Sequence, residues 1–231
     1  SSTYTSGAGS GGSIWIETAA LAGTNGQITA NGGNGGSGGG GGGRIALTYD
    51  PAAQNLLPAP TVRFTVTGGT ANDRNPEYIM GNDGDIGTLY FTDTRFLSGS
   101  VNHRGQMIVS NMVNLTTNSL VISNGIIRFR PVGFNLTVTG DLLITGNGAL
   151  QLGSTNVYTL LQYLPHFENF TTSAPLLAVG GNLILTNGGS LYMIAGVTNS
   201  STEAYGGLID VAGDVRIGPN SWIYPFSNPT N

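Results

Sequence analysis

The chain has 231 residues, of which 38 are glycine and only 9% are charged, and it contains no cysteine. Its 8 basic residues are all arginine and are scattered, the net charge is −4 and the pI is about 4.9, so we expect no nucleic-acid partner. The hydrophobic content of 39% excludes a disordered chain, and the irregular spacing of the glycines excludes collagen. No apolar run reaches the roughly 18 residues of a membrane span.

Residues 1–50 are expected to form glycine-rich β coils. Two glycine-rich runs, 7–12 and 32–43, each lead into a strand with alternating apolar residues, at 13–17 and 44–48. A bare Gly/Ser run is normally a flexible linker. Because each run here directly precedes a strand, we expect the second run to form a protruding or tightly turned loop between coils.

Residues 51–100 are expected to combine an irregular connector with further β coils. Three prolines, at positions 51, 58 and 60, mark the connector. Beyond it, short alternating runs at 62–67 and 89–91 predict strands.

Residues 101–231 contain a repeat. Three stretches align on one glycine (Gly140, Gly181 or Gly213), which an apolar residue precedes and Asp or Asn follows. Two apolar residues spaced by two come next, then a Gly/Asn turn and another apolar residue, and a degenerate copy lies at 120–125. The aligned glycines are 41 and 32 residues apart, so the copies differ in the length of their insertions. Short strands repeated in this way predict the stacked coils of a solenoid.

We therefore predict an all-β chain folded as a parallel β-helix with Gly/Asn-rich turns and inserted loops. Equivalent apolar residues of successive coils should stack into one interior column. Asn147, Asn187 and Asn220 are expected at the corners, because Asn tolerates the left-handed backbone conformation. The alternative, a β-sandwich, would need two-residue hairpin turns and would have no aligned glycine. The best helical candidate, Thr159–Leu164, would end within two turns at Pro165.

Several segments resemble a known kind of repeat array. They are GAGSGGSIWI (7–16), ITANGGNGGSGGGGGGRIAL (28–47), GTLYF (87–91), the three aligned copies and the final NSWIYPFSNPTN. In these segments the chain is similar to the glycine-rich, autotransporter-passenger-like parallel β-helix arrays of very large secreted proteins of environmental bacteria, of the Verrucomicrobia and Planctomycetes type. The resemblance implies a secreted or cell-surface structural or adhesive protein. It supplies no catalytic residues.

From the sequence we expect that the chain is not an enzyme. Many right-handed β-helices cleave polysaccharides, and hydrolysis needs two carboxyl groups on one face. Asp141 and Asp214 occupy the same repeat position, but the middle copy has Asn182 there, which fits a turn residue better than a catalytic one. The two histidines, His103 and His166, lie in loop-like contexts without a nucleophile motif or metal-ligand spacing.

The densest set of potential oxygen ligands lies between residues 73 and 85. Asp73, Asp83 and Asp85 form a candidate calcium site, which would serve as a structural staple, and an ordinary Asx-rich turn is the alternative. No other cofactor is expected. The N-glycosylation pattern occurs at Asn114, Asn135, Asn169 and Asn199.

The function that we expect is that of an extracellular or cell-surface structural protein. The ends of a solenoid expose unpaired strands and an apolar core, and the sequence contains no helix or charged strand that would cap them. We expect copies of the chain, or neighbouring coils of a longer chain, to occupy these ends and to build a fibre or filament. The chain opens on SSTYTSG without an initiator Met or an apolar leader, so we expect both ends to be cuts or processing sites.

The alternative function is a carbohydrate-binding adhesin or a degenerate polysaccharide-active β-helix. Outward-facing Trp15 and Trp222 would then stack on sugars. Other aromatic residues that could contribute to such a platform are Tyr90, Phe91, Tyr192, Tyr224 and Phe226.

Overall fold

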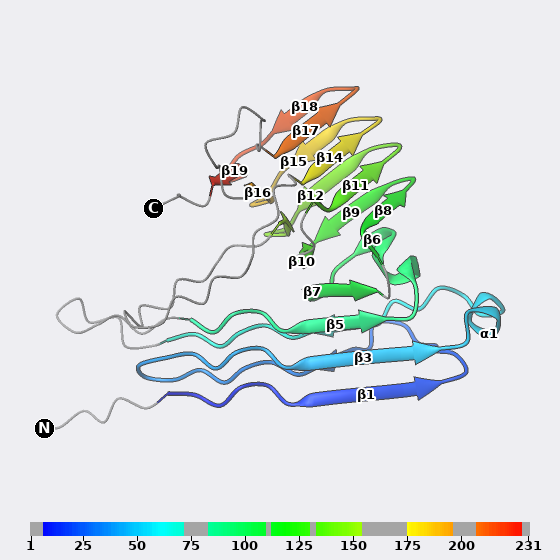
Figure 1. Cartoon of the computed structure of the whole chain (residues 1–231), viewed down its shortest axis with the longest axis vertical. Coiled ribbons are helices and arrows are strands. Elements are labelled where there is room, and N and C mark those ends of the chain that lie inside the picture. The colour runs from blue at the N-terminus through cyan, green and yellow to red at the C-terminus, as the bar shows by residue number, and fades with distance from the viewer. Residues whose placement is uncertain are drawn as a thin grey trace, which may run out of the picture. The chain divides into compact units, whose positions relative to one another are not determined.

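The computed structural model describes residues 7–71, 83–109, 112–129, 133–153, 175–195 and 207–227. These residues form parallel β-strands, with one α-helix, α1 (Pro51–Asn55), and one 3₁₀-helix, η1 (Thr94–Leu97) (Figure 1). The chain divides into two compact units. Unit 1 comprises Ser1–Phe96 with Asn102–Ser110, and unit 2 comprises Leu97–Val101 with Asn111–Asn231.

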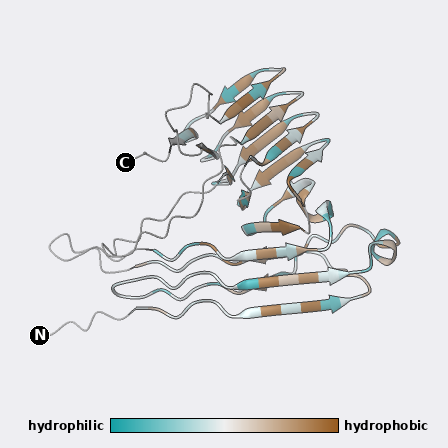
Figure 2. Ribbon diagram, viewed as in Figure 1, coloured by the Kyte–Doolittle hydropathy of each residue, from teal (hydrophilic) through white to brown (hydrophobic). Residues whose placement is uncertain are grey.

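Unit 1 contains a main column of strands and a shorter pair. The strands of the main column, in order of pairing, are β1 (Ser13–Thr18), β3 (Arg44–Tyr49), β5 (Thr88–Phe91) and β7 (Arg104–Val109). The shorter pair is β2 (Gln27–Thr29) with β4 (Arg63–Thr65). All of these pairs are parallel, and the alternation of apolar and polar residues along β1 and β3 is visible in Figure 2.

Unit 2 contains three columns of parallel strands. The first column consists of β8 (Asn114–Thr117), β11 (Asn135–Val138), β14 (Leu176–Val179) and β17 (Leu208–Val211). The second consists of β6 (Gly99–Val101), β9 (Leu120–Ser123), β12 (Leu142–Thr145), β15 (Leu183–Leu185) and β18 (Val215–Ile217). The third consists of β10 (Ile126–Phe129), β13 (Ala149–Leu152), β16 (Ser190–Ala195) and β19 (Trp222–Ser227).

Equivalent repeat positions stack directly in unit 2. Val138 pairs with Val179, which pairs in turn with Val211. Val138 and Val179 are buried, and Val211 in the last coil is half-buried. The strands are parallel, and the apolar residues of the copies form a common interior column. The predicted parallel β-solenoid is therefore confirmed, and the β-sandwich is excluded.

Asparagine occupies the left-handed corners of the coils. Asn124, Asn147, Asn187 and Asn220 have φ values of 52°, 58°, 50° and 55°. Each follows the strand of the second column and precedes that of the third, so the same turn recurs in successive coils. Residues other than Gly, Asn and Asp adopt this backbone conformation only at a cost in free energy, which explains the residue type at this corner.

The connector after residue 50 begins with a helix that the sequence analysis did not predict. The Asp50 carboxylate accepts the Ala52 N–H at 2.8 Å and so caps α1, and Pro51 opens the first turn. A helix of five residues is too short to show a 3.6-residue period, so no hydrophobic pattern could indicate it. The helical candidate Thr159–Leu164 lies outside the described residues.

The glycine-rich run 32–43 is packed against three other segments of unit 1. The Gly33 N–H donates to the Gly9 carbonyl at 3.0 Å, and the Gly40 N–H donates to Gly33 at 2.9 Å. The Gly69 N–H donates to the Gly40 carbonyl, and the Gly42 N–H donates to the Asp85 carbonyl, both at 2.8 Å. A strand in a sheet has two neighbours, whereas this run bonds segments on several sides. It is a packed element of unit 1.

The run needs glycine because its backbone neighbours are too close for a side chain. A Cβ added at Gly43 would lie 2.0 Å from the Gly12 carbonyl oxygen, and one at Gly40 would lie 1.9 Å from that of Gly9. Within this fully described run, no glycine has a φ in the left-handed region. Space, and not backbone conformation, therefore requires glycine here. The Cβ of a residue at position 41 would meet nothing within 4 Å.

A pair of matched substitutions tests this packing. Gly43→Ala should lower the free energy of unfolding by about 1–3 kcal/mol, because the new methyl group displaces a neighbouring backbone. Gly41→Ala should leave it within about 1 kcal/mol of the wild-type value, since its methyl group enters open space. Denaturant unfolding of both variants measures the difference, and equal effects would show that the run is not close-packed.

Candidate functional site

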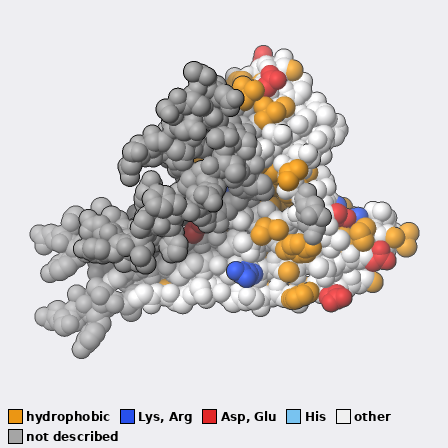
Figure 3. Space-filling view, in the orientation of Figure 1, with side chains coloured by type: hydrophobic (Ala, Val, Ile, Leu, Met, Phe, Trp, Pro, Cys, Tyr) orange, Lys and Arg blue, Asp and Glu red, His pale blue; other side chains and the backbone are white. Residues whose placement is uncertain are grey.

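The last coil of unit 2 exposes apolar side chains whose equivalents are buried in the preceding coils. Leu142 and Leu183 are buried, whereas their stacking partner Val215 is 51% exposed. Two positions later in the strand, Ile217 is 52% exposed. Figure 3 shows hydrophobic side chains at the surface over β17 and β18, next to acidic ones. The interior column of apolar residues is therefore exposed to solvent at this coil.

The strand edges of this coil are also open. Among the described residues, β17, β18 and β19 each pair with a strand on one side only. The Leu183 N–H donates to the Asp214 carbonyl at 2.9 Å. Because the backbone groups of successive residues alternate between the two sides of a parallel strand, those of Val215 and Ile217 face away from β15. The edge of β18 can therefore accept another parallel strand.

Proline makes the edge of β19 less suitable. The Trp222 N–H donates to the Gly189 carbonyl at 3.0 Å, so alternate residues Ile223 and Pro225 face the other side of the strand. Proline has no N–H group, and edge strands commonly carry it where it prevents pairing. The edge of β19 thus lacks one donor that the edge of β18 retains.

A ladder of Asp and Asn side chains links the corners of successive coils before β12, β15 and β18. The Asp141 carboxylate accepts the Asn182 N–H at 2.7 Å, and the Asn182 side-chain oxygen accepts the Asp214 N–H at 2.9 Å. Each side chain thus satisfies a backbone donor of the next coil. This explains why Asp and Asn exchange at this repeat position, because the contact needs only a side-chain oxygen.

Close approach explains the glycine before each member of this ladder. A Cβ at Gly181 would lie 2.3 Å from the Asp141 carboxylate, and one at Gly140 or Gly213 would lie 2.7 or 2.6 Å from a carbonyl oxygen of the preceding coil. None of these three glycines has a φ in the left-handed region. The repeat glycine therefore makes room for the ladder.

Asp214 is the last member of the ladder, and its carboxylate lies at the surface. Arg216 donates to it at 2.8 Å, and the two side chains are 63% and 68% exposed. An ion pair with this exposure contributes little to stability, because water screens it and ordering the side chains costs entropy. The Asp214 carboxylate is therefore available to a backbone donor from outside the unit.

The first strand of unit 1 presents a second open edge. Among the described residues, β1 pairs only with β3, and Trp15 is 76% exposed. The Arg44 N–H donates to the Gly12 carbonyl at 3.0 Å, so the backbone groups of Ser13 and Glu17 face away from β3. Ile14 and Ile16, on the interior side, are only half-buried.

The aromatic residues considered for a sugar platform differ in their exposure. Trp15 and Trp222 are exposed, and the Trp222 ring lies 6.2 Å from that of Tyr224 with an interplanar angle of 27°. Tyr192 and Tyr224 stack between coils at 4.9 Å. Phe91, by contrast, is buried in the core of unit 1 and cannot contact a ligand.

A shallow groove crosses the outer face of β11, β14 and β17. Its volume is about 340 Å³. Asp210 is its only carboxylate, and small residues form the rest of its lining: Thr137, Val138, Thr139, Ala178, Val179, Gly180 and Ala212. The groove offers hydroxyl groups but no pair of titratable side chains.

The two candidate calcium ligands that the structure describes accept hydrogen bonds from backbone N–H groups. Asp83 accepts the Ala71 N–H at 2.8 Å, and Asp85 accepts the Ile86 N–H at 2.8 Å. Asp73 lies outside the described residues. Within the described ranges, no group of three or more His, Cys, Asp or Glu residues is placed to hold a metal ion.

Two of the four glycosylation patterns lie on the surface of unit 2. Asn114 and Asn135 are exposed and are direct partners in β8 and β11. Asn169 and Asn199 lie outside the described residues.

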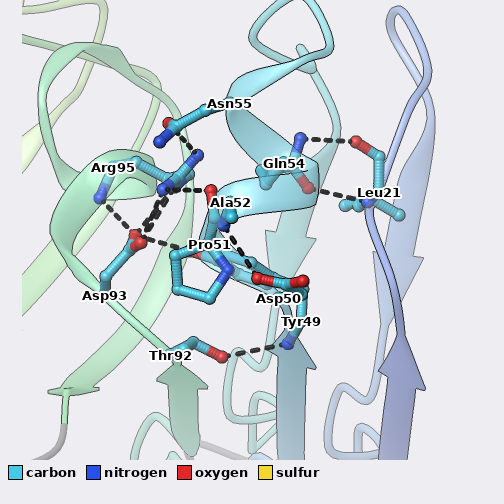
Figure 4. Close-up of polar contacts among 10 residues, drawn as sticks. All are labelled: Leu21, Tyr49, Asp50, Pro51, Ala52, Gln54, Asn55, Thr92, Asp93 and Arg95. Atoms are coloured by element: carbon cyan, nitrogen blue, oxygen red, sulfur yellow. Dashed lines mark hydrogen bonds and ion pairs between the residues drawn. The ribbon is translucent and has the colours of Figure 1, made fainter.

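Polar side chains hold α1 against the strand ends of unit 1 (Figure 4). The Asp93 carboxylate accepts the Tyr49 hydroxyl at 2.6 Å and the Arg95 guanidinium at 2.8 Å, and Arg95 also donates to Asn55 at 3.0 Å. The Gln54 amide donates to the Leu21 carbonyl at 2.9 Å and accepts the Leu21 N–H at 2.7 Å. It therefore binds the Leu21 backbone as a residue of a neighbouring strand would.

These contacts account for the pKa shifts at this corner. Burial, followed by the hydrogen bond to Asp93, raises the pKa of Tyr49. Burial by itself would raise the pKa of Asp93, but the hydrogen bonds from Arg95 and Tyr49 outweigh it and leave the pKa below its usual value. Tyr49 therefore stays a donor and Asp93 an acceptor, as a structural contact requires.

His103 is a buried core residue of unit 1. Its ring lies 5.2 Å from that of Phe64 and 5.7 Å from that of Phe91, and its Nδ1 accepts the Phe64 N–H at 3.3 Å. Burial lowers the pKa of His103 to about 4; a hydrogen bond with the Phe96 backbone opposes this shift, and Arg63 adds to it. A neutral imidazole therefore fills this place in the core.

The low pKa of His103 predicts a pH dependence of stability. Between pH 6.5, the ordinary pKa of histidine, and about pH 4, the unfolded chain binds a proton that the folded chain does not. The free energy of unfolding should therefore fall over this window by up to about 3 kcal/mol as the pH is lowered. His103→Phe should reduce this loss while keeping the same carboxylates. Denaturant titrations at pH 7 and pH 4 measure it, and an unchanged loss in the variant would contradict the assignment.

In the described parts of the chain, no helix has the length and apolar character that a membrane span needs. No protein-family model, no curated protein and no solved structure matches the chain.

Proposed function

We propose that the chain is an extracellular structural protein, a β-solenoid building block of a surface fibre or filament that assembles by end-to-end stacking of its coils. The observation that carries this proposal is the last coil of unit 2. Val215 and Ile217 occupy positions that are buried in the preceding coils, but both are about half exposed. Within the part of the chain that the structure describes, the strand that carries them pairs on one side only.

The last coil repeats an interface that is already present inside the unit. Each preceding coil buries its apolar residues and pairs its strands against the next coil. Covering Val215 and Ile217 would contribute on the order of 1 kcal/mol for each side chain, in addition to the strand hydrogen bonds. A contact between two different ends does not close on itself, so repeating it extends a filament.

The composition and the resemblance support the location. A chain with 9% charged residues and 38 glycines makes its surface from amides, hydroxyls and backbone. Its similarity to glycine-rich arrays of large secreted bacterial proteins supports a place outside the cell. The partners are then copies of the chain or neighbouring coils of a longer chain.

Assembly is tested by placing charge on the open coil. The double variant Val215→Asp and Ile217→Asp should raise the concentration for half-assembly at least about hundredfold, because two carboxylates would have to be buried without partners. Leu56→Asp is the matched control, since Leu56 is an exposed apolar residue at the end of α1. Sedimentation velocity over a concentration series, together with negative-stain microscopy, measures assembly. A wild-type chain that stays a compact monomer at high concentration would refute the proposal.

The exposure of two tryptophans favours a second candidate function, a carbohydrate-binding adhesin. Trp222 is 47% exposed and lies beside Tyr224, an arrangement that suits stacking against a sugar ring. On a glycan array, Trp222→Ala should weaken binding by about tenfold or more, with Leu56→Ala as the control. A wild-type chain that binds no glycan, or a Trp222→Ala variant that binds equally well, would remove this candidate.

A further inference from the structure

The outer edge of β1 resembles the open edge of β18 in its sequence pattern. β18 and its corner read Gly213-Asp214-Val215-Arg216-Ile217, and β1 with the residue before it reads Gly12-Ser13-Ile14-Trp15-Ile16. We propose that β1 of a second copy of the chain adds to β18 as a parallel strand, with Ser13 opposite Asp214 and Ile16 opposite Ile217. This inference rests on the proposed function and names the two strands that form the contact.

The backbone groups of the two edges are complementary. Ser13, Trp15 and Glu17 direct their N–H and C=O groups away from β3, and Val215 and Ile217 direct theirs away from β15. In the proposed register, the Trp15 N–H meets the Val215 carbonyl, and the Trp15 carbonyl meets the Ile217 N–H. Neither edge contains a proline, so no donor is missing.

The proposed register also continues the corner ladder. Inside unit 2, the Asn182 N–H reaches the Asp141 carboxylate, and the Asp214 N–H reaches the Asn182 side chain. In the proposed register Ser13 lies opposite Asp214, and its N–H faces the open side of β1. The exposed Asp214 carboxylate would accept this N–H as the next step of the same series.

The side chains match on both faces of the strand pair. On the interior face, Ile14 and Ile16 would cover Val215 and Ile217, which are 51% and 52% exposed. On the outer face, Trp15 would lie beside Arg216, whose guanidinium is exposed and suits the face of an indole ring.

The adjacent edge of β19 fits β1 less well. In the alternative register, with Ser13 opposite Trp222, the Trp15 carbonyl would meet Pro225, which has no N–H to donate. The geometry therefore favours the three-residue strand β18 over the six-residue strand β19.

Disulfide trapping tests the register, because the chain has no cysteine of its own. Glu17→Cys and Gly218→Cys are made in separate chains, and the two chains are mixed under oxidising conditions. These positions face each other in the proposed register, where a Cα separation of about 4.8 Å permits a disulfide. A Cβ at position 218 would lie 3.1 Å from the Thr186 hydroxyl, which can rotate away.

Two other mixtures serve as matched controls. Ser13→Cys with Gly218→Cys is displaced by four residues, or about 13 Å, and should give at least about tenfold less cross-linked product. Ser13→Cys with Trp222→Cys reports pairing with β19. In parallel, Asp214→Asn should retain assembly, since Asn182 performs the same task, whereas Asp214→Val should weaken it by about tenfold.

The outcomes separate this inference from the proposed function. Preferential cross-linking of positions 17 and 218, with the Asn and Val variants behaving differently, supports the β1–β18 contact. Cross-linking of positions 13 and 222, or assembly without cross-linking of positions 17 and 218, overturns the contact but leaves assembly standing. A wild-type chain that sediments as a monomer at every concentration overturns both.

Discussion

Parallel stacking in strict register is the constraint on which the rest of the structure depends. Each interior residue, such as Leu142, Leu183 or Val215, lies directly over its equivalent in the coil before it. A coil therefore has no core of its own and is buried only by its neighbours. Inside unit 2 this condition is met on both sides, and the last coil meets it on one side only among the residues that the structure describes. The exposed valine and isoleucine there follow directly from the repeat.

Close backbone approach is achieved differently in the two units. In unit 1, glycines such as Gly40 and Gly43 let neighbouring segments touch backbone to backbone, and hydrogen bonds leave the run in several directions. In unit 2, glycine makes room at the corner where Asp141 and Asn182 satisfy the N–H groups of the next coil. Both solutions use uncharged or locally paired groups, which is consistent with the low content of charged residues in the chain.

The periodicity of the sequence predicted the fold class, because the interior face of a strand shows as alternation and the coil repeat as an aligned glycine. The corner residues were predictable for a similar local reason, since few residue types tolerate a positive φ. The helix α1 was not predictable, because five residues carry no period. The hydrogen-bonded ladder of Asp141, Asn182 and Asp214 was not predictable either. The sequence shows that Asp and Asn exchange at this position, but it does not show which backbone N–H group each side-chain oxygen accepts.

By itself, the sequence determined that this chain is all-β, coiled and parallel, because local backbone preference and apolar alternation are properties of short segments. Only the tertiary structure decided which strands stack on one another and which strand edges lack a partner among the described residues. Those features depend on contacts between residues 30 to 40 positions apart, such as Asn182 with Asp214 and Gly189 with Trp222. The open edge of β18, the position of Pro225 on the open side of β19 and the exposure of Trp15 all follow from that stacking, which no local pattern specifies.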